Sequence, residues 1–234
     1  MAKITAWSFS RWQVYEKCPD QANYKFVIKV PVRQEEKGEA LIRGDLIHKE
    51  AEAYANGSLK ELPLNLRLLK PEFVALRKLP GASELQMAFT QKWEPTEWFA
   101  KDAWCRVIVD RLVPAAKNKG TVRVVDFKSG KLRDAKESGY SEQLELYSLA
   151  GLIAEPEAKS ASPELWFTDH GKIVKPEDVS GKPILYSRAD VPKLKKTWEL
   201  RTKAMLNDTR FGPKPGIHCR WCDFSKAKSG PCRF

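Results

Sequence analysis

The pattern of hydrophobic and polar positions changes near residue 84. From there, segments rich in Val, Ile, Phe and Trp alternate apolar with polar side chains and are separated by turn residues, as is typical of β-strands. These predicted strands cover residues 84–93, 103–113 and 121–128. A helix is predicted next, then a pair of strands and a basic amphipathic helix, at about 141–153, 164–168, 184–187 and 191–207.

Before residue 84 the signals are those of helix ends. Ser10-Arg-Trp-Gln13 has the Ser and the Gln of a capping box, which predicts a short helix that ends at about residue 18. A polar loop is predicted at 31–40, and further helices at about 45–56 and 71–79. Helices, then a short mixed sheet, then a helix packed against it predict an α/β (α+β) sandwich.

Length and composition favour one globular domain over residues 1–234. Hydrophobic residues make up 42% of the chain and charged residues 30%, enough apolar material for a core of this size. No stretch of about 18 apolar residues occurs, so we expect no membrane span. The first residues lack the apolar segment of a secretory signal. The cysteine count of five is odd, which favours the reducing cytoplasm (a host's, if the gene is carried by a phage) over a disulfide framework.

The net charge is strongly positive. The chain has 41 Lys and Arg against 30 Asp and Glu, a formal charge of +11. A basic protein of this kind favours a polyanionic partner such as DNA, because each neutralised phosphate releases condensed counterions. A solvated basic surface without a partner is the alternative that charge alone leaves open.

Two carboxylates and a lysine stand at the ends of neighbouring predicted strands. Asp110 follows Trp104-Cys-Arg-Val-Ile-Val, and the next strand ends as Asp126-Phe-Lys128. Because alternate side chains of a strand share a face, Asp126 and Lys128 are predicted to point the same way, with Phe127 in the core. Such carboxylates can hold hard divalent cations, and the lysine can stabilise charge on a phosphate under attack. The pattern indicates metal-assisted phosphodiester hydrolysis.

Polar residues on two predicted helices extend this pattern. Gly44-Asp-Leu-Ile-His48 places a histidine upstream of the sheet. Gln143 and Tyr147 are spaced i, i+4 on the helix after the strands and therefore face one side. That pair can brace the lysine, contact DNA or face solvent.

Cysteines at the two ends of the chain form a second candidate site. The tail has the spacing Cys-x2-Cys-x9-Cys, and thiolates so placed can chelate one soft metal centre. Taken alone, the tail suggests structural zinc with His218 or Cys105 as a fourth ligand. Cys105 alternates onto the face opposite Asp110 and is predicted to be a buried core thiol. The remaining cysteines are Cys18, Cys219, Cys222 and Cys232.

Five ordered elements resemble the RecB-type branch of the PD-(D/E)xK nuclease superfamily. They are Ser8-Phe-Ser-Arg-Trp-Gln-Val-Tyr15-x2-Cys18-Pro19, Gly44-x3-His48, Asp110, Asp126-Phe-Lys128 and Gln143-x3-Tyr147. The resemblance implies a restriction-endonuclease-like core with a mixed central sheet flanked by helices. It also implies that Mg²⁺ or Mn²⁺ is bound by His48, Asp110, Asp126 and the Phe127 carbonyl. Lys128 is then catalytic, with Gln143 and Tyr147 beside it.

The resemblance extends to the cysteines and to the activity. Relatives with one cysteine before the nuclease motifs and three after them carry a [4Fe–4S] cluster, which implies that residues 1–20 and 211–234 are joined as an iron–sulfur clamp; zinc is the alternative. The function implied is a metal-dependent DNA exonuclease acting at DNA ends, with partners in recombination, repair or CRISPR adaptation. A DNA-end-binding module that does not cut and a structure-specific endonuclease are the rival interpretations.

Overall fold

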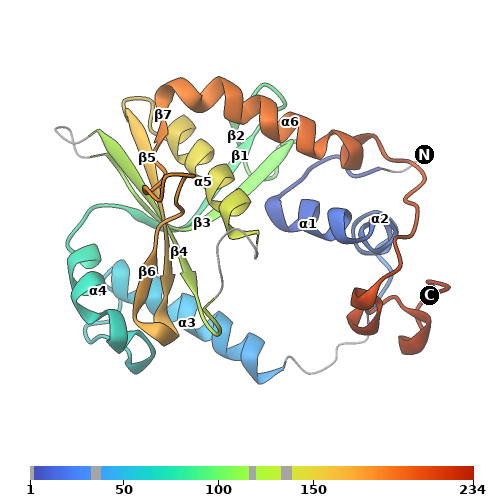
Figure 1. Cartoon of the computed structure of the whole chain (residues 1–234), viewed down its shortest axis with the longest axis horizontal. Coiled ribbons are helices and arrows are strands. Elements are labelled where there is room, and N and C mark those ends of the chain that lie inside the picture. Colours follow the sequence, from blue (N-terminus) through green and yellow to red (C-terminus); the bar gives the residue numbers. More distant parts are fainter. Residues whose placement is uncertain (1–2, 33–37, 116–119, 133–138) are drawn as a thin grey trace.

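A mixed β-sheet with helices on both faces forms the body of the molecule (Figure 1). The computed structural model describes residues 3–32, 38–115, 120–132 and 139–234. The main path of the sheet runs β2-β1-β3-β4-β5-β6, and β7 pairs with β5. Among the strands of the described residues, only β4 and β5 pair in parallel, as expected when a helix, α5, connects two strands of one sheet. The strands are β1 (Ala82–Phe89), β2 (Pro95–Thr96), β3 (Cys105–Val113), β4 (Thr121–Lys128), β5 (Ser160–Phe167), β6 (Lys172–Val174) and β7 (Tyr186–Ser187).

The described part of the chain contains six α-helices. They are α1 (Phe9–Lys17), α2 (Pro19–Ala22), α3 (Glu39–Ala55), α4 (Lys70–Arg77), α5 (Tyr140–Ala154) and α6 (Val191–Asn207). A π-helical turn follows α2 at Asn23–Ile28, and a 3-10 helix precedes α4 at Leu64–Leu69.

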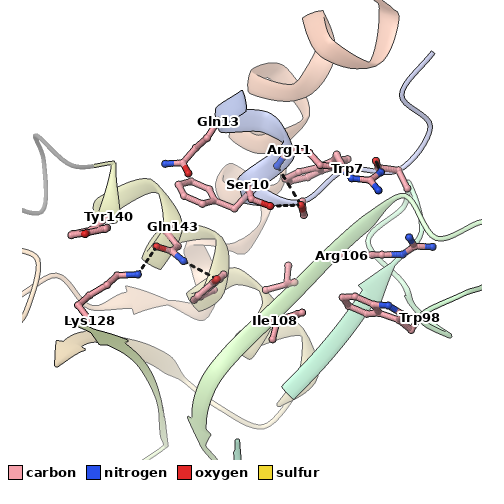
Figure 2. A pocket seen from close by; sticks show the side chains of 15 residues that line it. Trp7, Ser10, Arg11, Gln13, Trp98, Arg106, Ile108, Lys128, Tyr140 and Gln143 are labelled. Atoms are coloured by element: carbon pink, nitrogen blue, oxygen red, sulfur yellow. Dashed lines mark hydrogen bonds between the residues drawn. The ribbon is translucent and has the colours of Figure 1, made fainter. Parts of the chain in front are cut away.

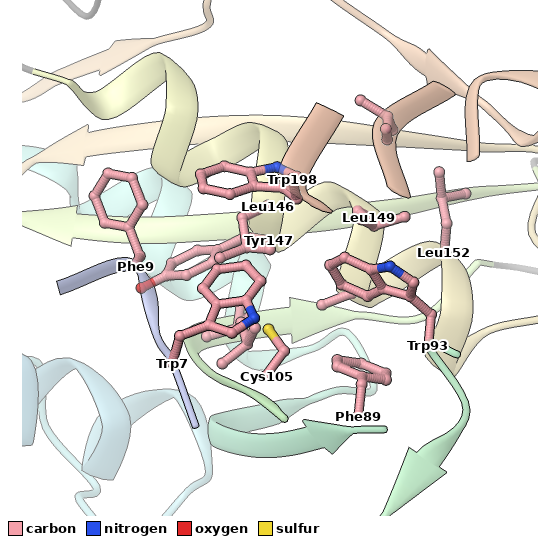
Figure 3. Packing of buried hydrophobic residues seen from close by; sticks show 14 of the residues in the cluster. Trp7, Phe9, Phe89, Trp93, Cys105, Leu146, Tyr147, Leu149, Leu152 and Trp198 are labelled. Atoms are coloured by element: carbon pink, nitrogen blue, oxygen red, sulfur yellow. The ribbon is translucent and has the colours of Figure 1, made fainter. Parts of the chain in front are cut away.

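The apolar core lies in separate clusters on the two faces of the sheet. On the face of α5 and α6, Trp7 stacks on Trp198 with ring centroids 5.6 Å apart, and the fully buried Cys105 packs among the aromatic rings (Figure 3). On the other face, side chains of α3 and α4 pack against β4, where Phe127 stacks on Phe73. The sheet is therefore covered on both sides, and polar groups that enter it are buried.

Strands β3 and β4 pair over only part of their length. Their backbone register runs from Val113–Arg123 to Arg111–Val125 and stops there. Beyond that point the N-terminal segment lies along β3: the N–H of Trp7 donates to the carbonyl of Trp104 at 2.9 Å, and the N–H of Arg106 donates to the carbonyl of Trp7 at 2.8 Å. This arrangement sets the start of α1 against β3.

The N-terminal helices and the C-terminal tail lie side by side (Figure 1). The hydroxyl of Tyr15 donates to Asp208 at 2.8 Å, and the ammonium of Lys214 donates to the carbonyl of Glu16 at 3.0 Å. The rings of Tyr24 and Phe224 add an aromatic contact. The N-terminal helices and the C-terminal tail are thus in contact in the fold.

Most predicted elements are confirmed, with errors at their ends. The strand at 121–128 and the helix at 191–207 have the predicted bounds. The capping box at Ser10 was wrong: the N-cap of α1 is Ser8, whose hydroxyl accepts from the N–H of Arg11 at 3.4 Å. Helix α3 begins at residue 39 rather than 45, inside the predicted polar loop; residues 33–37 of that loop lie outside the described residues.

The remaining differences concern strands. The predicted strand 84–93 begins earlier, at Ala82. It ends at Phe89, before a turn that includes Trp93, whose φ is +64°. Strand β5 begins at residue 160 rather than 164, and the predicted strand 184–187 is reduced to two residues. The short strands β2 and β6 were not predicted. Among the described residues, no helix is both long and apolar enough to span a membrane.

Candidate active site

Three of the predicted site residues, Asp110, Asp126 and Lys128, lie where β3 and β4 separate. Asp110 is 9% exposed and Asp126 only 1%, so both carboxylates are buried. The Asp110 carboxylate accepts a hydrogen bond from the backbone N–H of Phe127 at 2.7 Å, which connects the strands beyond their last backbone pair. Alternation along β4 is as predicted: Val125 and Phe127 pack in the core beside α3 and α4. Asp126 and Lys128 point the other way, and their charged groups are 2.6 Å apart.

A histidine and two carboxylates form the group best suited to a cation. His48 on α3 approaches the Asp110 carboxylate, with 3.3 Å between Nδ1 and Oδ2. Glu84 of β1 joins them, and one ligand atom from each of the three residues lies within 4.8 Å of the others. These side chains line a cavity of about 570 Å³ that also contains Asp45 and Glu52. The surplus of negative charge in this cavity, referred to below as the acidic cavity, suits a divalent metal ion.

Glu84 is the member of this group that sequence reasoning missed. Its neighbours Ser83 and Leu85 pair with Arg111 and Val109, so the register places Glu84 opposite Asp110. Its φ of +48° lies in the left-handed region, which a glutamate in a strand rarely adopts. The available signal was an acidic residue in a strand predicted to enter the core. Only the pairing of β1 with β3 shows that its carboxylate meets another one.

A chain of polar contacts with residues of α5 holds the Lys128 side chain in place. The Lys128 ammonium donates to Gln143 Oε1 at 3.2 Å, and Gln143 Nε2 donates to the Tyr147 hydroxyl at 2.8 Å. Lys128 also lies 4.7 Å from the centre of the Tyr140 ring, within range of a cation–π contact. The i, i+4 pair on α5 therefore braces the lysine, one of the arrangements that its spacing allowed.

Burial and neighbouring charges shift the pKa values of this group. Burial raises the pKa of Asp126 to about 6, with Asp110 adding to the rise and Lys128 opposing it. Burial also raises the pKa of Glu84, with a further contribution from Asp110. For His48, burial acts to lower the pKa, but the hydrogen bond and charge of Asp110 outweigh it and the pKa is raised. Asp126 and Glu84 thus hold protons more tightly than ordinary carboxyl groups, chiefly because they are buried.

The helix that carries His48 is held close to the end of β4 by two features. A Cβ on Gly44 would stand 3.3 Å from the Ser129 hydroxyl oxygen, so glycine permits the close approach of α3. The neighbouring Arg43 pairs with Asp169, which also accepts from the N–H of Gly130 at 2.6 Å. Close packing against Ser129 therefore explains why a glycine occupies the first position of the Gly-x3-His pattern.

The four cysteines predicted to share a metal centre are brought together at the chain ends. Burial raises the pKa of Cys222, and Cys18, Cys232 and Cys219 add to the rise as neighbouring charges. All four are free thiols. Backbone N–H groups of the tail donate to two of the sulfurs, at 3.5 Å to Cys18 and 3.4 Å to Cys219. Cys105 lies apart in the core, as predicted, and burial raises its pKa.

Comparisons with known proteins agree with this picture. The sequence profile of the PD-(D/E)XK nuclease superfamily matches residues 6–227. No curated protein matches the chain. A solved structure from Eubacterium rectale, described as a "putative exonuclease", has a TM-score of 0.55 and 15% identity over 93% of this chain and 87% of that one. The crystal structure of SSO0001 has a TM-score of 0.44 and 14% identity, covering 100% and 88% of the two chains. At 15% identity the Eubacterium rectale structure shows a shared fold.

Proposed function

Because the chain belongs to the PD-(D/E)XK nuclease superfamily, we propose that it is a metal-dependent DNA exonuclease that hydrolyses phosphodiester bonds at DNA ends. The observation that carries the proposal is the pair of adjoining groups at the separation of β3 and β4. His48, Glu84 and Asp110 lie close enough together to hold a cation, and Asp126 pairs with the Lys128 ammonium. The preference for ends rests on the resemblance to the RecB-type branch.

The donor set of the acidic cavity fits a hard divalent cation. Two carboxylates and one imidazole are ligands that Mg²⁺ and Mn²⁺ accept, and Mn²⁺ tolerates the nitrogen better. The cross-strand pair of Glu84 and Asp110 places like charges opposite each other, which is destabilising unless a cation lies between them. We therefore assign His48, Glu84 and Asp110 as ligands, with Asp126 and the Phe127 carbonyl as further ligands on the strength of the resemblance. When bound, the cation would polarise the phosphate and lower the pKa of a water.

The residues of this chain supply orientation and a second positive charge. Lys128 is held from two sides, by Asp126 at 2.6 Å and by Gln143 at 3.2 Å. Its ammonium is therefore fixed before substrate arrives, and a preorganised charge stabilises a transition state without reorganisation. The contact between Gln143 and Tyr147 keeps the amide oriented toward the lysine.

We also propose that the cysteine site holds a [4Fe–4S] cluster that joins the two ends of the chain. Four cysteines are the ligand set of such a cluster, and hydrogen bonds to the sulfurs, as seen at Cys18 and Cys219, are among its tuning interactions. Within the described residues, the His48 group is the only set of three such ligands within 4.8 Å of one another. No three of the described cysteine sulfurs therefore lie within 4.8 Å of one another, whereas the sulfurs of a tetrahedral zinc site with bonds of about 2.3 Å would be roughly 3.8 Å apart.

The test of nuclease function compares DNA with and without ends. With Mn²⁺, the protein should degrade end-labelled linear DNA and leave covalently closed circles intact. Asp126→Ala and Lys128→Ala should abolish cutting, whereas Lys101→Ala, at an exposed lysine outside the site, should cut at the parental rate. Parental cutting by both site variants would refute the assignment, and efficient linearisation of circles would favour an endonuclease.

A further inference from the structure

A second cavity, of about 600 Å³, is lined in part by Lys128 (Figure 2). It is bounded by the first turn of α1, by β3 and by the start of α5. In contrast to the acidic cavity, its described lining includes no Asp or Glu, while Arg11, Arg106 and Lys128 all contribute to it. We call it the basic cavity. The acidic cavity and the basic cavity thus have opposite charge, one suited to a cation and the other to an anion.

The two arginines of the basic cavity have no carboxylate partner among the described residues. The Arg11 guanidinium donates to the carbonyl of Ala6 at 2.8 Å, and Arg106 Nε is buried without a hydrogen-bond partner. Burial lowers the pKa of Arg11, and the charge of Arg106 lowers it further. Two guanidiniums that repel each other beside a cavity indicate a site for an anion supplied from outside, and phosphate is an anion whose geometry the Arg guanidinium matches.

The start of α1 adds to the positive potential. This helix has nine residues and begins at Phe9, after the N-cap Ser8, and both residues line the basic cavity. The first N–H groups of a helix lack intrahelical acceptors and favour negative charge near them. The backbone bonds that join Trp7 to Trp104 and Arg106 hold this helix start against β3. The position of Arg11 relative to Arg106 is therefore set by the fold.

An aromatic surface lies at the β3 side of the same cavity. Trp98 lines it, with the Arg106 guanidinium 5.6 Å from its ring centre. The adjacent Phe99 is 87% exposed. Trp7, also in the lining, is 1% exposed. Aromatic rings beside arginines are the means by which proteins bind unpaired bases and their phosphates together.

We propose that the basic cavity binds the unpaired end of a DNA strand, with phosphates at Arg11 and Arg106 and a base on Trp98. This inference rests on the proposed nuclease function and specifies the substrate as single-stranded DNA. The volume is that of a small-molecule site, so it accommodates nucleotides of one strand and excludes a duplex. Trp98 and Lys128 lie at opposite ends of the lining (Figure 2). A DNA strand with a base on Trp98 would pass along the cavity toward Lys128, which would bring its next phosphodiester bond toward the metal-binding group.

The test is a binding measurement that requires no cutting. The anisotropy of a fluorescein-labelled 12-nucleotide oligo(dT) is measured in EDTA over a range of salt concentrations, with an unlabelled RNA oligomer and a hairpin-capped duplex as competitors. Arg11→Gln and Arg106→Gln should each reduce the slope of log K against log salt by about 0.7, the value for one phosphate contact on a single strand. Trp98→Ala should weaken binding about 5- to 150-fold, the effect of removing one stacked base.

Matched variants keep the result interpretable. Trp98→Phe retains a ring and should bind close to the parental affinity, and Arg67→Gln, at an exposed arginine beside α4, should leave the slope unchanged. Parental affinity and slope in the Arg11, Arg106 and Trp98 variants would overturn the proposal, as would equal competition by the capped duplex or stronger competition by RNA. If the proposal is overturned in this way but the protein still cuts DNA, the nuclease function is retained and only the role of the basic cavity is rejected. If binding follows the prediction but no cutting occurs, the cavity stands and the nuclease proposal fails.

Discussion

The Asp126–Lys128 pair allows a quantitative test of the site in the metal-free protein. The perturbation is Lys128→Met, which keeps most of the length of the side chain and removes its charge. At 2.6 Å the gross attraction between the two charges is about 6 kcal/mol for an effective dielectric constant of about 20. Desolvation offsets part of this attraction in the intact pair. Removing one partner leaves Asp126 buried at 1% exposure, and breaking a buried pair in this way typically costs about 3–5 kcal/mol.

The sign of the pH dependence follows from the pKa of Asp126. Burial already raises that pKa to about 6, and Lys128 is the largest influence that lowers it, so the variant's pKa lies higher still. A carboxyl group with a raised folded-state pKa loses stability as pH rises from its unfolded value, about 3.9, through its folded value. The 3–5 kcal/mol deficit of Lys128→Met should therefore be present at pH 8 and fall below about 1 kcal/mol at pH 5, where the carboxyl is protonated in the folded parent and variant alike.

Urea unfolding in EDTA at the two pH values measures this deficit. Lys101→Met serves as the control for a lysine outside the pair. The double variant Asp126→Asn with Lys128→Met removes both charges and should return to within about 1 kcal/mol of the parent, since neutral replacements of buried pairs are often tolerated. An equal deficit at pH 5 and pH 8, or a double variant no more stable than Lys128→Met, would refute the reasoning.

Three further outcomes are expected. Glu84→Gln should weaken Mn²⁺ binding at least tenfold, measured by calorimetry. The affinity of the parental protein for Mn²⁺ should rise from pH 5.5 to 7.5, because the raised pKa of Glu84 lets protons compete with the metal at low pH. An affinity that does not depend on pH would contradict this expectation. Anaerobically purified protein should be brown, with absorbance near ~400 nm; Cys222→Ala should remove the colour and Cys105→Ala should keep it, whereas colourless protein with one zinc and no iron would exclude the cluster. Gly44→Val should lower nuclease activity more than Gly38→Val, because a Cβ at Gly44 meets Ser129 Oγ whereas a Cβ at Gly38 has no atom within 4 Å. Equal activity of the two variants would show that the close approach of α3 is unimportant.

The sequence determined what depends on neighbours along the chain. Alternation in β4 predicted that Asp126 and Lys128 share a face and that Phe127 enters the core, because successive side chains of a strand point to opposite faces. The same rule separated Cys105 from Asp110. The i, i+4 spacing put Gln143 and Tyr147 on one side of α5. Strong local patterns also gave β4 and α6 their bounds, whereas two-residue strands such as β2 carry too few positions to show a period.

Only the tertiary structure decided which distant residues meet. Glu84 joins His48 and Asp110 because the register of β1 on β3 and a left-handed backbone angle bring its carboxylate there, and neither can be read from residues near position 84. Arg11 and Arg106 line one cavity because the N-terminal segment fills the place that β4 leaves along β3. Local patterns specify the direction of a side chain within its element. The net charge of a site depends on side chains from several helices and strands, so it is determined only by the way these elements pack together.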